Sequence, residues 1–178
     1  MSIGNLARDR WVKILCVALS LLLTLAWIGF IFSNSLKSGT ASGEQSSKVH
    51  EVVNKVAQTL GAKEEISQDT VRSGAHFAEF AILGFLLCLS IASLWCLRGG
   101  SRLPRLMGFG CLSLPVCAIL AATDEYLQTF SEGRSTELSD AILDTVGALA
   151  GIAAFTAIVA VVWWIRTQRE KKAKREAD

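Results

Sequence analysis

The 178-residue chain is too apolar for an ordinary soluble domain, since 51% of its residues are hydrophobic and its mean hydropathy is +0.41. Only 19% of the residues are charged, and these fall between long apolar runs instead of being evenly spread. The net charge of +2 says little about partners, and no folded nucleic-acid-binding module accompanies it, so we expect no nucleic-acid partner. The pattern indicates a membrane protein.

Four apolar runs reach the length of about 20 residues that a helix needs to cross a bilayer core of about 30 Å. We therefore predict an all-α fold, an integral membrane four-helix bundle that forms one domain over residues 1–178. The predicted helices lie at about 12–32, 76–97, 105–123 and 141–165, with an outer loop at 34–75 and a basic cytoplasmic tail at 166–178. The first run has a basic head, as signal sequences do, but it exceeds the usual apolar length of about 7–15 residues, so we expect it to be retained.

The basic residues alternate across the four runs. The N-terminal tail and the loop between the second and third runs carry three Lys or Arg each, and the C-terminal tail carries six. The two intervening segments together carry six, of which five are spread over the 42 residues of 34–75. Because cytoplasmic segments of membrane proteins are enriched in Lys and Arg, both termini are predicted to be cytoplasmic.

The outer loop contains a helical pattern of its own. Between residues 45 and 60, one face is apolar (Val49, Val52, Val53, Val56 and Leu60) and the other is polar. This pattern predicts an amphipathic helix that lies in the outer interface or packs over the mouth of the bundle. Gly61 ends it, and a short helical turn is expected to begin near Ser67.

Ionisable side chains occur at the ends of the runs that the charge pattern places outside. An acid at the centre of a bilayer costs about 3 kcal/mol on insertion scales, so such groups usually face a bundle interior or a wet cavity. Because successive helices run in opposite directions, these residues are predicted to form one polar cluster at the outer face. They are His76 and Glu79 in the second run, Asp124, Glu125 and Gln128 at the end of the third, and Asp140 and Asp144 at the start of the fourth.

Some of these residues also have a purely structural interpretation. Asp140, or Ser139 beside it, is suited to cap the fourth helix, and Asp124 with Glu125 is suited to begin a solvated loop. Gly147 and Gly151 are four residues apart, which predicts a packing face against the second or third helix.

Together these segments resemble the VanZ-like family. The family's Asp-Glu pair, Gln, aromatic residue and Gly-Arg, followed by a last helix that opens with acidic and glycine residues, match residues 124–134, Asp140, Asp144, Gly147 and Gly151. Residues 76–84, preceded by Arg72, resemble its His-containing second helix, and residues 32–35 resemble its serine-containing exit from the first. The sequence departs from the pattern at Asp144, where Asn is usual, at Ser73, where Lys is common, and at Lys37, where Gln is frequent.

The resemblance implies a multi-pass protein of the bacterial cytoplasmic membrane. The family is named for a protein linked to teicoplanin resistance. We expect the outer cluster to act on or bind envelope lipids or wall-linked substrates, with a contribution to glycopeptide resistance. Two alternatives stay open: a non-catalytic protein that binds envelope lipid or antibiotic, and a structural membrane subunit whose charged cluster is an internal ion-pair network. Whether the chain is an enzyme is left open.

Roles can be assigned under the enzyme hypothesis. His76 and Glu79 would supply acid and base, while Asp124, Glu125 and Asp140 would bind a divalent cation or transfer protons. Substrate would contact Arg72, Gln128, Arg134 and Asp144, with Arg134 on an anionic head group.

The sequence also limits cofactors and partners. It contains no nucleotide-binding loop, haem motif or HExxH run, so no organic cofactor is expected. An acid-rich cluster with one histidine suits a hard divalent cation better than zinc. The expected partners are membrane lipids and an envelope lipid precursor or lipoglycopeptide, and a homo-oligomer stays open.

Overall fold

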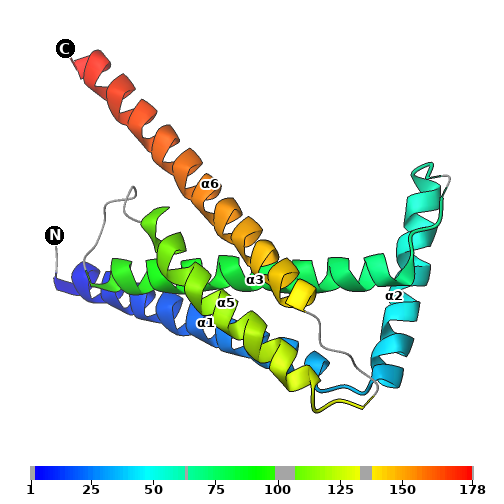
Figure 1. The fold of residues 1–178 in the computed structure, drawn as a ribbon. Helices are drawn as coiled ribbons and strands as arrows, with labels where there is room; N and C mark the ends of the chain where they lie inside the picture. The colour runs from blue at the N-terminus through cyan, green and yellow to red at the C-terminus, as the bar shows by residue number, and fades with distance from the viewer. Residues whose placement is uncertain (1–2, 63, 99–106, 133–137, 178) are drawn as a thin grey trace.

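The computed structural model describes residues 3–62, 64–98, 107–132 and 138–177, and these residues contain no strand. Four helices are long and apolar enough to cross a membrane, and a further helix lies crosswise at one end of the bundle (Figure 1). The predicted all-α bundle with a helix in the first outer loop is thereby confirmed. The elements in chain order are α1 (Ile3–Ser35), α2 (Gly39–Thr59), α3 (Gln68–Leu97), the 3-10 turn η1 (Met107–Phe109), α5 (Gly110–Gln128) and α6 (Leu138–Ala177).

The helices extend beyond the apolar runs from which they were predicted. Helix α3 begins at Gln68, and the Ser67 hydroxyl caps it by accepting a hydrogen bond of 3.2 Å from the backbone N–H of Thr70. The short turn expected near Ser67 and the second span are therefore one helix. Helix α5 continues past residue 123 to Gln128, and α6 continues through the basic segment to Ala177. Hydropathy reports only the part of a helix that suits hydrocarbon, so it does not detect polar helix ends.

Helices α1 and α3 are joined by hydroxyl groups within their apolar length. The hydroxyls of Ser20 and Ser93 lie 2.8 Å apart, and those of Thr24 and Ser90 lie 2.9 Å apart. In a bilayer such interhelical hydrogen bonds contribute on average only about 0.6 kcal/mol each, because the same groups also find partners in the unfolded state within the membrane. These contacts fix the register of α1 on α3.

Helices α3 and α6 approach closely at glycines. A Cβ atom added to Gly151 would lie 1.8 Å from the carbonyl oxygen of Ala81, and one added to Gly147 would lie 2.4 Å from that of Phe77. The glycine pair therefore packs on the second span, as the spacing predicts. Because Phe77 follows His76 in the chain, and Gly147 lies about one turn after Asp144, this contact also sets His76 opposite Asp144.

The bundle has an apolar core, and the outer faces of its helices are also apolar. One buried cluster combines residues of all four spans: Ile31, Phe80, Leu83, Cys117, Ala121 and Ala148. Outside it, large apolar side chains are exposed along the helices, for example Leu22 at 65% and Ile119 at 67%. Such surfaces are unfavourable in water and suited to lipid. The chain is thus built as a multi-pass membrane protein.

Helix α2 is held to the segment that follows it. Asn54 is 5% exposed; its side-chain oxygen accepts a hydrogen bond of 2.8 Å from the backbone N–H of Ile66, and its amide group donates one of 3.0 Å to the Ile66 carbonyl. Gly61, with φ of 94°, makes the turn between them. Val52 and Val56 on α2, and Leu60 directly after it, belong to the predicted apolar face and are exposed.

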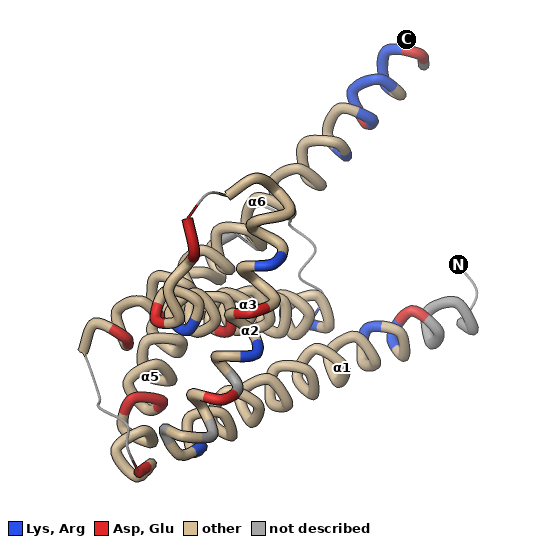
Figure 2. The backbone as a smooth tube through the Cα atoms, turned by 90° about the vertical axis from the view of Figure 1, so that its right-hand side faces the viewer, with Lys and Arg blue, Asp and Glu red and all other residues tan. Residues whose placement is uncertain are grey.

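Both ends of the chain lie at the same end of the bundle, opposite α2 (Figure 1). Basic residues crowd the last turns of α6, which project beyond the other helices (Figure 2). The ends of the four spans next to α2 are the C-terminal ends of α1 and α5 and the N-terminal ends of α3 and α6. The predicted site residues belong to these ends.

Candidate functional site

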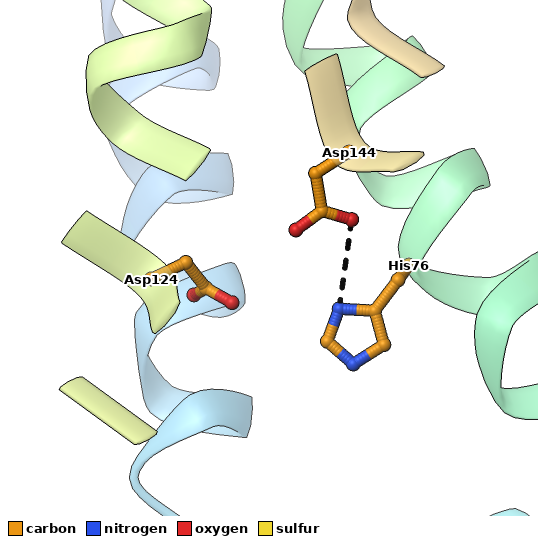
Figure 3. Close-up of side chains that lie close together, drawn as sticks. All are labelled: His76, Asp124 and Asp144. Carbon is orange, nitrogen blue, oxygen red and sulfur yellow. Dashed lines mark ion pairs between the residues drawn. The ribbon is translucent and has the colours of Figure 1, made fainter. Parts of the chain in front are cut away.

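Three of the predicted residues, each from a different helix, converge near the α2 end of the bundle. His76 comes from α3, Asp124 from α5 and Asp144 from α6, and one ligand atom of each lies within 4.8 Å of the others. His76 is 13% exposed, whereas Asp124 and Asp144 are fully buried. Figure 3 shows the two carboxylates and the imidazole turned toward a common space between the helices.

The contact between His76 and Asp144 is an ion-pair distance and not a hydrogen bond. The Nδ1 atom of His76 lies 3.8 Å from Oδ1 of Asp144 (Figure 3), beyond the range in which a hydrogen bond forms. Among the described residues, neither carboxylate oxygen of Asp144 has a hydrogen-bond partner. A buried carboxylate without such partners is costly, which makes Asp144 unusual in this structure.

Asp124 belongs to a hydrogen-bonded network that joins the ends of α1 and α5. The hydroxyl of Ser35 donates to Oδ1 of Asp124, and the amide of Gln128 donates to Oδ2 at 3.1 Å and to Oε1 of Glu125 at 3.3 Å. Ser131 donates a hydrogen bond of 2.9 Å to the carbonyl oxygen of Ser35. All five residues are buried. The interpretation of Asp124 and Glu125 as the start of a solvated loop is therefore wrong, because α5 continues and turns both side chains inward.

Glu79 lies on the side of α3 that faces α1. Its Oε1 atom accepts a hydrogen bond of 3.0 Å from the amide of Asn34, and the Asn34 side-chain oxygen accepts one of 2.8 Å from the ammonium of Lys37. The backbone carbonyl of Glu79 accepts a hydrogen bond of 2.9 Å from the Trp27 indole. Although His76 and Glu79 are three residues apart, His76 therefore contacts α6 while Glu79 contacts α1.

A partly open cavity of about 70 Å³ lies next to this cluster. Helices α1, α2 and α3 supply its walls, which combine charged, hydroxyl, amide and apolar groups. The lining residues are Asn34, Ser42, Ser46, Val49, Val71, Arg72, Ala75, His76 and Glu79. His76 thus belongs both to the cavity wall and to the group with Asp124 and Asp144.

The remaining predicted residues have different positions. Arg72 lines the cavity. Asp140 is half-buried in the first turn of α6 and does not belong to the group of converging ligand atoms. Arg134 lies outside the described residues. Its assignment to an anionic head group stays a prediction.

Two residues of the site were not singled out from the sequence as members of it. Asn34 contacts Glu79, and Ser35 contacts Asp124, both from the last turn of α1. Serine and asparagine at a helix end are too common to signal a site by themselves. The sequence offered one signal, the depth of these residues in the membrane. The C-terminal end of the first span is expected at the same depth as the acids at the ends of the other three spans.

The fold and the site define the class: a four-span membrane protein with a buried His and acid group at one end of its bundle, beside a polar cavity. A sequence model of the VanZ/LLP1 family matches residues 20–162, which is most of the chain and covers part or all of each of the four spans. The chain belongs to this family. Neither a curated protein nor a solved structure matches it.

Proposed function

We propose that this protein binds the phosphate-bearing head group of an envelope lipid or lipid-linked wall precursor in the cavity beside His76. The observation that carries the proposal is the composition of the cavity wall, in which Arg72 and His76 lie with hydroxyl and amide groups between apolar helix faces. The wall also contains the Glu79 carboxylate, whose Oε1 atom accepts a hydrogen bond from the Asn34 amide. A guanidinium is the side chain best suited to a phosphate, since it donates two parallel hydrogen bonds. Acyl chains would lie along the exposed apolar faces outside the cavity.

The volume of the cavity limits what enters it. About 70 Å³ accommodates a few water molecules or a small group such as a phosphate. A glycopeptide antibiotic is far larger than this. A contribution to teicoplanin-type resistance would therefore act through the bound lipid or precursor, and not through enclosure of the drug.

The charge pattern supports an outer location for the cavity. Lys and Arg concentrate in the segments at the opposite end, including the six basic residues from Arg166 to Arg175. With that end in the cytoplasm of a bacterial cell, α2 and the cavity face the outer leaflet. The exposed apolar residues of α2 would then lie in the interface between lipid and water, beside the cavity opening.

The structural alternative is supported by one observation, the hydrogen-bonded network of Ser35, Asp124, Gln128, Glu125 and Ser131. This network joins α1 to α5 and would stabilise the bundle without any ligand. It does not include Arg72 or the cavity, so the two functions can be separated by mutation.

The test is the lipid that remains bound to the protein. The protein would be extracted from bacterial membranes in mild detergent, and its bound lipids identified by native mass spectrometry. We expect phosphate-bearing lipid on the wild type and at least a fivefold lower occupancy on Arg72→Gln. Lys48→Gln is the matched control, since it removes an exposed cation from α2 that does not line the cavity. Equal lipid occupancy in the wild type and Arg72→Gln would refute the proposal.

A further inference from the structure

The buried group of His76, Asp124 and Asp144 has the composition of a metal site. It offers one imidazole nitrogen and two carboxylate oxygens from three different helices, within 4.8 Å of one another. We propose that these three residues bind one divalent cation, with Mn²⁺ as the preferred ion. The inference deepens the proposed function and rests on it in one respect, because His76 is also a wall of the head-group cavity.

Asp144 provides the independent evidence. It is fully buried, its two oxygens have no hydrogen-bond partner, and Figure 3 shows its carboxylate directed into the space shared with His76 and Asp124. The side-chain oxygen of Gln128, whose amide contacts Asp124, is also buried without a partner. Hydrogen bonds satisfy most buried polar atoms in folded proteins, so oxygen atoms left over in one place indicate a missing positive group.

The spacing of the atoms fits an ion better than a direct bond. His76 Nδ1 and Asp144 Oδ1 are 3.8 Å apart, too far for a hydrogen bond. Two ligands that are each about 2.1 Å from one ion lie roughly 3 to 3.6 Å from each other. His76 and Asp144 would need to approach by a few tenths of an ångström, and a pair of ligand atoms as far apart as 4.8 Å by roughly 1 Å, to complete the site.

The ligand types favour Mn²⁺ among common ions. Carboxylates suit Mg²⁺, Ca²⁺ and Mn²⁺, whereas imidazole suits transition metals, and Mn²⁺ accepts both. Three protein ligands leave coordination positions for water or for a phosphate oxygen. Because His76 also lines the cavity, the ion would offer a second binding group to a phosphate that reaches this wall.

The experiment measures Mn²⁺ on the purified protein in lipid nanodiscs after removal of metal with a chelator. We expect one Mn²⁺ per chain, with a pulsed electron paramagnetic resonance spectrum that shows coupling to one imidazole nitrogen. The chain contains only two histidines, His50 and His76, so the source of the nitrogen can be assigned. His76→Gln should abolish the coupling and His50→Gln should retain it.

Substitution of the acids tests the rest of the site. Asp144→Asn keeps the shape of the side chain and should weaken Mn²⁺ binding at least tenfold, whereas Asp69→Asn, an exposed change on α3, should not alter it. Equal Mn²⁺ affinity in the wild type and Asp144→Asn overturns the site. A wild-type spectrum without nitrogen coupling also overturns it, and this readout requires no variant to fold. If Arg72→Gln loses its lipid but the wild type binds no Mn²⁺, the ion site is rejected and the head-group proposal stands. If the wild type binds Mn²⁺ but carries no lipid, the head-group proposal is rejected and the ion site stands.

Discussion

Substitution of Gly151 by alanine tests the close packing that sets His76 opposite Asp144. The added methyl group would lie 1.8 Å from the Ala81 carbonyl oxygen, roughly 1.6 Å short of the 3.4 Å at which ordinary contact begins. The atom it meets belongs to the backbone of α3, which cannot move aside as a flexible side chain would. Overpacking of this kind typically costs about 1–3 kcal/mol, and the better helix propensity of alanine offsets about 1 kcal/mol. We expect a net loss of about 1 kcal/mol, and at most about 2 kcal/mol, in the free energy of unfolding.

The control for this substitution is Gly29→Ala in α1. Gly29 is exposed, and an added Cβ there has no neighbour within 4 Å, so helix propensity alone should stabilise the protein by about 0.5–1 kcal/mol. Both variants would be unfolded reversibly by increasing the fraction of sodium dodecyl sulfate in mixed micelles. If Gly151→Ala is as stable as Gly29→Ala, the close approach of α3 and α6 is not present in the protein and the placement of His76 against Asp144 loses its basis.

Three further predictions concern other parts of the fold. Thr24→Val should lower the free energy of unfolding by about 0.5–2 kcal/mol in the same assay, because it removes the hydrogen bond to Ser90 while keeping the shape of the side chain; no change would mean that α1 is held by packing alone. Asn54→Ala should cost about 1–3 kcal/mol, because it leaves the buried N–H of Ile66 without its acceptor, and should speed proteolysis of the loop after α2, a result that unchanged cleavage would contradict. Alkaline phosphatase should be active when fused after Gly61 and inactive when fused after Lys171, and the opposite pattern would reverse the orientation.

Much of the fold follows from the sequence because a bilayer restricts it strongly. Uncharged runs such as 14–32 have few options in lipid other than a helix, and the spacing of Gly147 and Gly151 identified the packed face of α6. The family assignment came from the residues around Asp124 together with Asp140 and Asp144, and the match over residues 20–162 shows it. These features depend on composition and short-range spacing, which a single sequence displays directly.

The finer arrangement of the site depends on helix rotation, which the sequence does not determine. His76 and Glu79 were predicted to join one polar cluster, and both line the cavity, yet the packing of α3 between α1 and α6 directs His76 toward Asp144 and Glu79 toward Asn34. Asn54 stood on the polar face of a predicted amphipathic helix, but the segment before Ser67 folds back and buries it. Such contacts arise from tertiary packing between distant residues and leave no local pattern.

The environment of Asp144 separates two explanations for a buried carboxylate in this bundle. A proton would neutralise the side chain but would leave one oxygen without a donor, and Asp144→Asn should then be tolerated with no response to metal. A bound cation would contact the carboxylate directly, and a ligand that binds only the folded state stabilises it by about 2.7 kcal/mol at 100 times its dissociation constant. We therefore expect Mn²⁺ at that excess to raise the free energy of unfolding of the wild type by about this amount, and that of Asp144→Asn by about 1.4 kcal/mol or less, since a site at least tenfold weaker is then at no more than about 10 times its dissociation constant. An equal response of both proteins to Mn²⁺ would show that the ion binds elsewhere, and no response in the wild type would favour the proton.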